Sequence, residues 1–155
     1  MPIENHASML GEIVAILQSL EFALRAYLQR RAGDPPLGVP HGTDFYSLPV
    51  GSQLALTPMT NFDSLGELIK KFNLSRHAGE AVVDESLVRL RDAIAHGRVS
   101  APGPTGTLRL LKFSREKHGQ VTIEFNEVMT AEWFEGGIAR AKSALMLVYG
   151  SIESA

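Results

Sequence analysis

Apolar residues recur at three- and four-residue steps along residues 4–31, which is the spacing of one helical face. The pattern predicts a long helix that Gly33-Asp34-Pro35-Pro36 ends. Ile16, Phe22 and Ala23 widen the apolar face, so we expect the helix to pack on a second side against another helix or another subunit. The main face consists of Leu10, Ile13, Val14, Leu17, Leu20, Leu24, Tyr27 and Leu28.

A long connection and two shorter helices are expected next. Residues 33–61 are rich in glycine, proline and threonine, which predicts an irregular segment with short extended pieces around Phe45-Tyr46 and Gln53-Leu54-Ala55-Leu56. Asp63 or Ser64 is placed to cap a helix whose apolar residues are Leu65, Leu68, Ile69 and Phe72. After a break at 73–79, a helix over about 80–96 would carry the apolar stripe Val83, Leu87, Leu90 and Ile94, with Gly97 as its C-terminal glycine.

The C-terminal part of the chain predicts a β-hairpin and a final helix. Residues alternate within 108–113 and within 121–125, and Lys117-His118-Gly119 supplies a turn between the two segments. Thr130 is placed to cap the helix and Gly150 to stop it. Its core face would consist of Phe134, Ile138, Ala141, Leu145 and Val148.

These elements predict a mainly α fold in one domain over residues 1–155: a helical bundle with a long N-terminal helix and one β-hairpin before the C-terminal helix. The chain has 155 residues, of which 45% are hydrophobic and 21% charged, as in ordinary globular proteins. A formal net charge of −2 argues against the broad basic surface of a non-specific DNA binder, though not against a small basic cleft. The chain has no cysteine, which excludes disulfides, thiolate catalysis and zinc–sulfur sites.

The N-terminus lacks the basic region of a signal peptide, and we expect no apolar run of membrane-spanning length. A cytoplasmic location without membrane association is therefore the expectation.

The most informative segment is Leu90-Arg91-Asp92-Ala93-Ile94-Ala95-His96-Gly97. An arginine, a polar residue, three further residues and a histidine stand at the end of a predicted amphipathic helix. This pattern resembles the Arg-x(4–6)-His signature of the HEPN superfamily. The resemblance implies a HEPN-like helical fold and a homodimer in which the two motif helices face each other. In active members it implies an endoribonuclease that needs neither a metal nor another cofactor.

The residue types suit that chemistry. RNA cleavage without a metal needs a base for the ribose 2′-hydroxyl, an acid for the leaving 5′-oxygen and positive charge on the phosphate. His96 would act as general acid or base, and Arg91 would stabilise the phosphorane. Asp92 lies four residues before His96, hence on the same helical side, and would orient the imidazole. Arg91 and His96 are about 140° apart around a regular helix, so the spacing favours a site shared by two chains or a helix that distorts at its end.

Other residues complete the predicted site. Arg89, Arg98 and Arg109 surround the motif and would contact RNA phosphates, or serve as ordinary surface charge. His6, His41 and His77 have no partner at ligand spacing, so no metal site is expected. The resemblance also implies a role in toxin–antitoxin, phage-defence or RNA-processing systems, with an antitoxin or another protein as partner. A non-catalytic HEPN-like module for dimerisation or partner binding is the alternative, in which His96 serves only the helix C-terminus.

Overall fold

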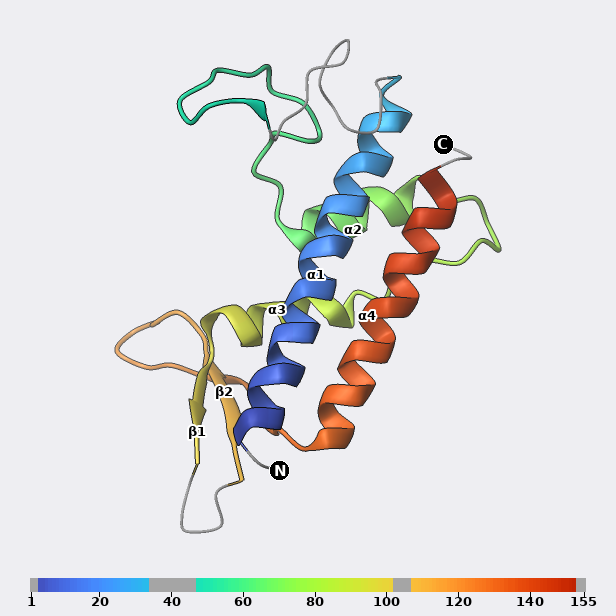
Figure 1. Cartoon of the computed structure of the whole chain (residues 1–155). Helices are drawn as coiled ribbons and strands as arrows, with labels where there is room; N and C mark the ends of the chain where they lie inside the picture. The colour runs from blue at the N-terminus through green and yellow to red at the C-terminus, as the bar shows by residue number, and fades with distance from the viewer. Residues whose placement is uncertain (1–2, 34–46, 102–106, 153–155) are drawn as a thin grey trace. The chain divides into compact units, whose positions relative to one another are not determined.

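The computed structural model describes residues 3–33, 47–101 and 107–152. In chain order its elements are α1 (Ile3–Arg31), α2 (Leu65–Leu74), α3 (Ser86–His96), β1 (Arg98–Ser100), β2 (Arg109–Phe113), β3 (Ile123–Val128) and α4 (Ala131–Ile152) (Figure 1). The prediction of a mainly helical fold with a hairpin before the last helix is therefore confirmed. The HEPN-like form of the bundle stays a prediction.

The chain forms two compact units, which we describe one at a time. The first unit comprises Met1–Leu17 and Asp84–Lys142, and the second comprises Gln18–Val83 and Ser143–Ala155. α1 and α4 each contribute one part to the first unit and one part to the second. The expectation of a single domain over residues 1–155 stays a prediction.

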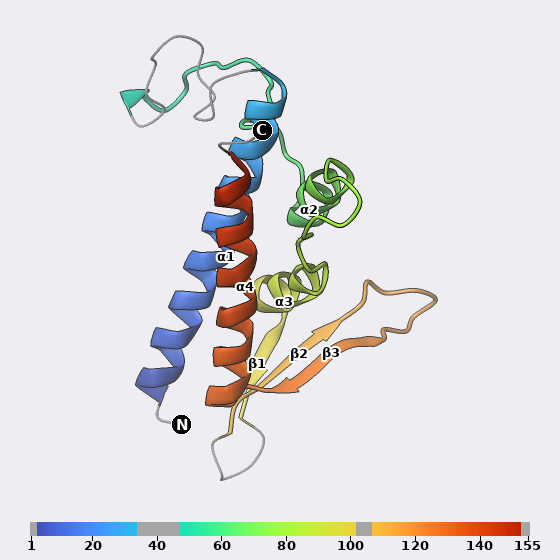
Figure 2. The same cartoon turned by 90° about the vertical axis from the view of Figure 1, so that its right-hand side faces the viewer.

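The sheet of the first unit is antiparallel, with the strand order β1-β2-β3. Figure 2 shows the three strands side by side, with the loop between β2 and β3 extending past their ends. Lys117 and Gln120 exchange backbone hydrogen bonds of 2.8 and 3.0 Å across the tip of this loop. The two residues between them, His118 and Gly119, both have positive φ (54° and 76°), as a two-residue hairpin turn with the twist of its strands requires. The predicted hairpin and its turn are thus confirmed.

β1 is a strand that the sequence pattern did not predict, because its three exposed residues are too few to show an alternation. Gly97 separates it from α3 with an extended backbone (φ −78°, ψ 173°) rather than the left-handed conformation of most C-terminal glycines. A Cβ at Gly97 would overlap the carbonyl oxygen of Ala93 and come within 2.6 Å of Leu110 Cδ1. Glycine is therefore required here, because the last turn of α3 and strand β2 both come close to this position.

α3 begins at Ser86, later than the predicted start near residue 80. The Asp84 carboxylate accepts hydrogen bonds from the backbone N–H and the hydroxyl of Ser86, at 2.8 and 2.5 Å. Before it, the side-chain amide of Asn73 pairs with both backbone groups of Val83, at 2.8 and 2.9 Å, and holds that residue outside any helix. The buried face of α3 consists of Leu87, Leu90 and Ala93, whereas Ile94 is only half-buried.

The first parts of α1 and α4 run side by side within the first unit (Figures 1 and 2). A Cβ at Gly137 of α4 would come within 2.8 Å of Ile13 on α1 and 3.3 Å of Leu90 on α3, so the three helices pack closely at this glycine. The predicted cap is confirmed, since the Thr130 hydroxyl accepts a hydrogen bond of 3.1 Å from the N–H of Trp133. The predicted stop at Gly150 is wrong, because α4 continues to Ile152.

The second unit confirms the predicted short helix, with Ser64 as its cap. The Ser64 hydroxyl accepts from the N–H of Glu67, and the Glu67 carboxylate accepts from the N–H of Ser64, which completes a capping box. Within the predicted irregular segment, residues 47–61 contain no strand, and Phe45-Tyr46 lie outside the described residues. Arg25 of α1 holds the end of this segment by donating to the carbonyl oxygens of Asn61 and Asp63 at 2.9 and 2.7 Å.

α1 is long and apolar enough to cross a membrane, since the 27 residues Asn5–Arg31 include an 18-residue window with a mean hydropathy of 1.4. The expectation that no apolar run reaches spanning length is therefore wrong by length and composition. Core helices of globular proteins meet the same criterion, and α1 buries Ile13 and Leu17 in the first unit and Leu20, Leu24 and Tyr27 in the second. Its Glu12 carboxylate also pairs with Lys142 of α4 at 2.7 Å.

Candidate functional site

Two residues of the predicted motif line one pocket of the first unit. Asp92 is half-buried and His96 is exposed at the C-terminal end of α3, and the pocket beside them has a volume of about 690 Å³. The other lining residues come from β2, the hairpin loop and β3: Lys112, Phe113, Ser114, Arg115, Lys117 and Glu124. We call this the His96 pocket. Because it is formed by α3 and the hairpin together, the sequence pattern of α3 alone did not predict its opposite wall.

The unpaired charge of the His96 pocket is basic. Lys112 is neutralised by Glu124 at 2.7 Å, and Asp92 lies 3.6 Å from Arg91. Arg115 and Lys117 form no ion pair within the part of the chain that the structure describes. Two free cations therefore face the same space as the exposed imidazole of His96, which suits an anionic ligand.

Arg91 is not among the residues that line the His96 pocket. Its side chain is 37% exposed, and its ion pair among the described residues is the one with the adjacent Asp92. α3 stays regular to its end, since the N–H of Gly97 donates to the carbonyl oxygen of Ala93 at 2.7 Å. The spacing allowed Arg91 and His96 to meet either across two chains or through a distorted helix end. The end of α3 is not distorted, so the second alternative does not apply.

The three arginines predicted to contact RNA lie around the sheet. Arg98 of β1 covers the ring of Phe113 at 5.3 Å, beside the wall of the His96 pocket. Arg89 donates to the carbonyl oxygen of Glu124 at 3.3 Å. Arg109 donates to the side-chain oxygen of Asn126. Arg98 therefore lies next to the pocket, because the ring that it covers, Phe113, lines it. Arg89 and Arg109 are instead hydrogen-bonded to residues of β3.

Sequence reasoning missed the basic residues of the hairpin loop. The run Arg115-Glu116-Lys117-His118 carries the signal, because charged residues around a tight turn stay exposed. The sequence of this run does not show which element the loop faces in the fold. That depends on the antiparallel register of β1, β2 and β3, which brings the loop to the end of α3.

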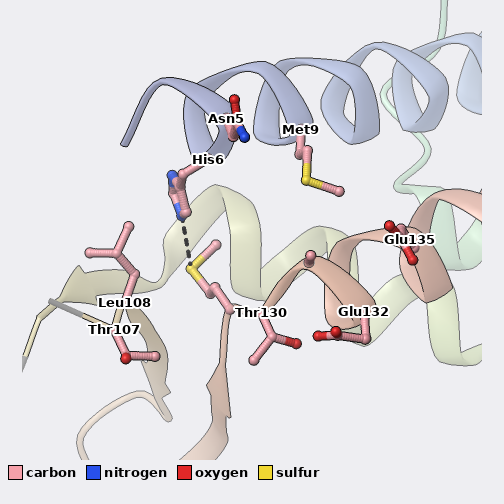
Figure 3. Close-up of a pocket in the computed structure, with 10 residues that line it drawn as sticks. Asn5, His6, Met9, Thr107, Leu108, Thr130, Glu132 and Glu135 are labelled. Carbon is pink, nitrogen blue, oxygen red and sulfur yellow. Dashed lines mark hydrogen bonds between the residues drawn. The ribbon is translucent and has the colours of Figure 1, made fainter. Parts of the chain in front are cut away.

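A second pocket of the first unit lies at the start of α1, and sequence reasoning did not predict it. Its volume is about 620 Å³. Figure 3 shows His6 projecting from α1 into the pocket, with Glu132 and Glu135 on α4; the dashed line is its contact with the sulfur of Met129. We call it the His6 pocket, and its lining residues are Asn5, His6, Met9, Thr107, Leu108, Met129, Thr130, Ala131, Glu132 and Glu135.

His6 is only 7% exposed, and its ring packs edge-on against Phe134 at 5.2 Å. Its Nε2 lies 3.5 Å from the sulfur of Met129. Burial lowers the pKa of His6 below the ordinary value of 6.5, so the imidazole is neutral at neutral pH. The pKa of the Glu132 carboxyl is also lowered, by hydrogen bonds from its own N–H and from the Thr130 side chain. Glu132 is therefore ionised, and His6 supplies no charge to balance it.

Among the described residues, no group of three histidine, aspartate or glutamate side chains is arranged to hold a metal ion. Comparisons with protein-family models, curated proteins and solved structures found no match to this chain. The HEPN-like assignment therefore rests on the Arg91–His96 motif and its place at the end of α3.

Proposed function

We propose that this protein is a HEPN-like homodimeric endoribonuclease that cleaves RNA at the His96 pocket without a metal. The observation that carries the proposal is the composition of that pocket. The exposed imidazole of His96 and the carboxylate of Asp92 share it with two unpaired cations, Arg115 and Lys117. The chemistry implied by the HEPN resemblance requires an acid–base group beside cations that can bind a phosphate, and the residues of this pocket support that requirement.

His96 is the general acid and base in the proposed reaction. As a base it takes the proton of the ribose 2′-hydroxyl, whose oxygen then attacks the neighbouring phosphorus. The 5′-oxygen then leaves with the proton that the same imidazole has taken up. Asp92 orients the imidazole from the same side of α3. Lys117 and Arg115 hold the phosphate on which negative charge develops.

Arg91 enters the proposed site from the partner chain. Within one chain it lies about 140° around α3 from His96 and does not line the pocket. In the proposed dimer, two α3 helices lie face to face, and Arg91 of one chain reaches the pocket of the other. Two-fold symmetry makes this contact occur twice. A guanidinium there would stabilise the phosphorane through two parallel hydrogen bonds.

The proposal includes the setting that the resemblance implies. The enzyme would act in the cytoplasm, in a toxin–antitoxin, phage-defence or RNA-processing system, with an antitoxin or another protein as partner. Arg98 would contact RNA beside Phe113. Arg89 and Arg109 would reach RNA phosphates only by giving up their bonds to Glu124 and Asn126.

RNA cleavage in the presence of a chelator tests the proposal. We expect the purified protein to cut RNA in EDTA, and His96→Ala to lower the rate by about 10²–10⁴-fold, the usual contribution of general acid–base catalysis. His118→Ala is the matched control, because this exposed histidine of the hairpin turn does not line the pocket. Equal rates for wild type and His96→Ala would overturn the assignment of His96.

One observation favours a second candidate, a non-catalytic module for dimerisation or partner binding. Arg91 and His96 lie on different sides of a regular α3, so a single chain does not assemble the pair. In a module, Arg91→Ala would weaken the dimer or the partner complex, measured by sedimentation, and no RNA cleavage would be present to lose.

A further inference from the structure

Glu124 and Lys112 are the charged residues of the His96 pocket that the proposed reaction does not use. They line it together with Arg115 and Lys117, the two unpaired cations. A carboxylate beside these cations repels a phosphate that they would hold, so Glu124 makes the pocket less suited to an anion alone. Its presence there is instead explained by an uncharged part of the substrate that needs hydrogen-bond acceptors.

A β-bulge brings Glu124 to the pocket. Lys112 of β2 pairs with Phe125 of β3, whereas the next residue of β2 pairs with Ile123. Glu124 lies between these two pairs and has no partner on β2, which makes it the extra residue of the bulge. Arg89 of α3 donates to its carbonyl oxygen at 3.3 Å and so holds the bulged backbone. Bulges beside functional sites commonly redirect a side chain, and this one places a carboxylate at the pocket.

The ion pair of Lys112 and Glu124 keeps hydrogen-bonding capacity on both partners. Lys112 Nζ donates to Glu124 Oε2 at 2.7 Å, and an ammonium group has two further N–H donors. Glu124 Oε1 accepts no hydrogen bond among the described residues. The two side chains are 22% and 44% exposed, so a ligand in the pocket can reach both. A donor group therefore lies beside two acceptor oxygens.

This order of donor and acceptors matches the Watson–Crick edge of guanine. Guanine has two adjacent donors on that edge, N1–H and the N2 amino group, next to the acceptor O6, and no other standard RNA base has two adjacent donors there. A carboxylate can accept from both donors at once while an ammonium group donates to O6. The aromatic residue Phe113 also lines the pocket, and aromatic side chains commonly contact unpaired bases in RNA-binding proteins.

We propose that Glu124 and Lys112 select guanine as the base of the nucleotide whose 2′-hydroxyl is attacked. This inference rests on the proposed nuclease function. The base and the 2′-hydroxyl belong to adjacent carbons of one ribose, so a guanine bound by Glu124 brings its own 2′-hydroxyl into the pocket of His96. The guanine is unpaired, because the protein binds the edge that would form a base pair.

The position of the cut follows from this arrangement. The 2′-oxygen gives its proton to His96 and bonds to phosphorus, the bond from phosphorus to the 5′-oxygen breaks, and the 5′-oxygen leaves with that proton. One product ends in guanosine 2′,3′-cyclic phosphate, and the other begins with a 5′-hydroxyl.

Titration of the full chain with mononucleotides tests the base site without requiring cleavage. The probes are 3′-GMP, 3′-AMP and 3′-IMP, which lacks only the N2 amino group of 3′-GMP. Binding is followed by NMR at the backbone amide of Glu124 and the imidazole of His96. We expect 3′-GMP to bind about tenfold more tightly than 3′-AMP, as one bidentate base contact provides, and 3′-IMP to lie between them.

Glu124→Gln separates recognition of the base from the effect of charge. Loss of a carboxylate would by charge alone tighten all three nucleotides alike. An amide has one acceptor oxygen in place of two, and its N–H groups oppose the donors of guanine, so we expect the preference for 3′-GMP over 3′-AMP to fall to below about threefold. Glu127→Gln makes the same change on β3 outside the pocket and should keep the preference. Thermal unfolding shows that both variants remain folded.

Cleavage of oligonucleotides that contain a single ribonucleotide then connects the base site to the reaction. Each probe is DNA except at one position, where the ribonucleotide is rG, rA, rC or rU, and the reaction is run in EDTA. We expect cleavage after rG to be about tenfold faster than after the other three, and Glu124→Gln to reduce this difference.

The outcomes distinguish the guanine site from the nuclease itself. Equal cleavage after all four ribonucleotides, or a preference for 3′-GMP that Glu124→Gln leaves unchanged, would overturn the guanine site and leave the nuclease. Selective binding of 3′-GMP that depends on Glu124, without cleavage after rG, would keep guanine recognition and overturn the nuclease. Neither binding up to roughly 10 mM nucleotide nor cleavage would overturn both.

Discussion

At the scale of single residues, the histidines of this protein divide by their surroundings. His6 is buried against Phe134 and Met129, whereas His96 is exposed beside two unpaired cations. Sequence spacing selected His96, because it ends an apolar helix five residues after an arginine. The same reasoning set His6 aside, because its partners lie far along the chain: Met129 directly after β3 and Phe134 on α4.

Burial of His6 makes the stability of the protein depend on pH. Its folded pKa lies below the ordinary value of 6.5, so the unfolded chain binds a proton at higher pH than the native protein does. The stability that neutral His6 contributes is complete above pH 6.5 and is lost as the pH falls from 6.5 to the folded pKa. Glu132 and Glu135 line the same pocket, but burial of the ring is the cause of the lowered pKa.

Urea unfolding at pH 7.5 and pH 5.5 measures the effect. We expect the wild-type protein to be less stable at pH 5.5, and His6→Leu to lose much of this difference. His118→Leu alters an exposed histidine and should keep it. The same decline in His6→Leu as in the wild type would show that other groups cause the pH dependence.

The proposed role of Lys117 in the nuclease also depends on a single residue, because it rests on one unpaired charge. We expect Lys117→Gln to weaken RNA binding and to lower the slope of log affinity against log salt by about 0.7, the value for one phosphate contact on a single strand. Lys70→Gln makes the same charge change on α2 and should alter neither quantity. Fluorescence polarisation with labelled RNA in the non-cleaving His96→Ala background gives both values. A salt slope that Lys117→Gln leaves unchanged would remove Lys117 from the RNA contact.

At the scale of elements, the junction between α3 and the sheet determines where His96 lies. Gly97 allows β2 to pass close to the last turn of α3, and this contact brings the hairpin to His96. We expect Gly97→Ala to destabilise the protein by about 1–3 kcal/mol, since a methyl group there overlaps backbone and Leu110.

Gly136→Ala provides the contrasting change within α4. A Cβ at Gly136 meets nothing within 4 Å, so alanine should stabilise the helix by about 0.5–1 kcal/mol. Chemical denaturation compares the two variants directly. An unchanged unfolding free energy for Gly97→Ala would show that neither the last turn of α3 nor β2 restricts this position.

Elements fixed by neighbouring residues could be predicted from the sequence. The Ser64–Glu67 capping box, the His118-Gly119 turn and the Thr130 cap each depend on residues only a few positions apart. The elements that were missed depend on distant contacts. α3 starts late because the Asn73 side chain binds both backbone groups of Val83, and β1 exists because β2 pairs with it.

The candidate site likewise combines a part that local spacing predicted with a part that depends on distant contacts. Asp92 and His96 share one side of α3, which their spacing predicted, and both line the pocket. Its basic wall comes from the hairpin, whose position depends on strand register and on Gly97. Helical spacing alone gave no means of pairing the loop with the motif.

At the scale of the whole molecule, the proposed active site requires two chains. One chain holds His96, Asp92 and two unpaired cations in its pocket, while Arg91 lies on another side of α3. A two-fold homodimer would let each chain supply Arg91 to the other's His96. A nuclease built in this way is inactive as a monomer, and its activity depends on protein concentration.

Mixing two inactive variants tests this central claim most directly. Arg91→Ala and His96→Ala homodimers each lack one partner in both sites, whereas their heterodimer has one complete site and one empty one. After subunit exchange, we expect RNA cleavage in EDTA to recover to about a quarter of the wild-type rate, because half of the dimers are mixed and each holds one of two sites. No recovery above the separate variants, in a mixture shown by mass spectrometry to contain heterodimers, would contradict a site shared between chains.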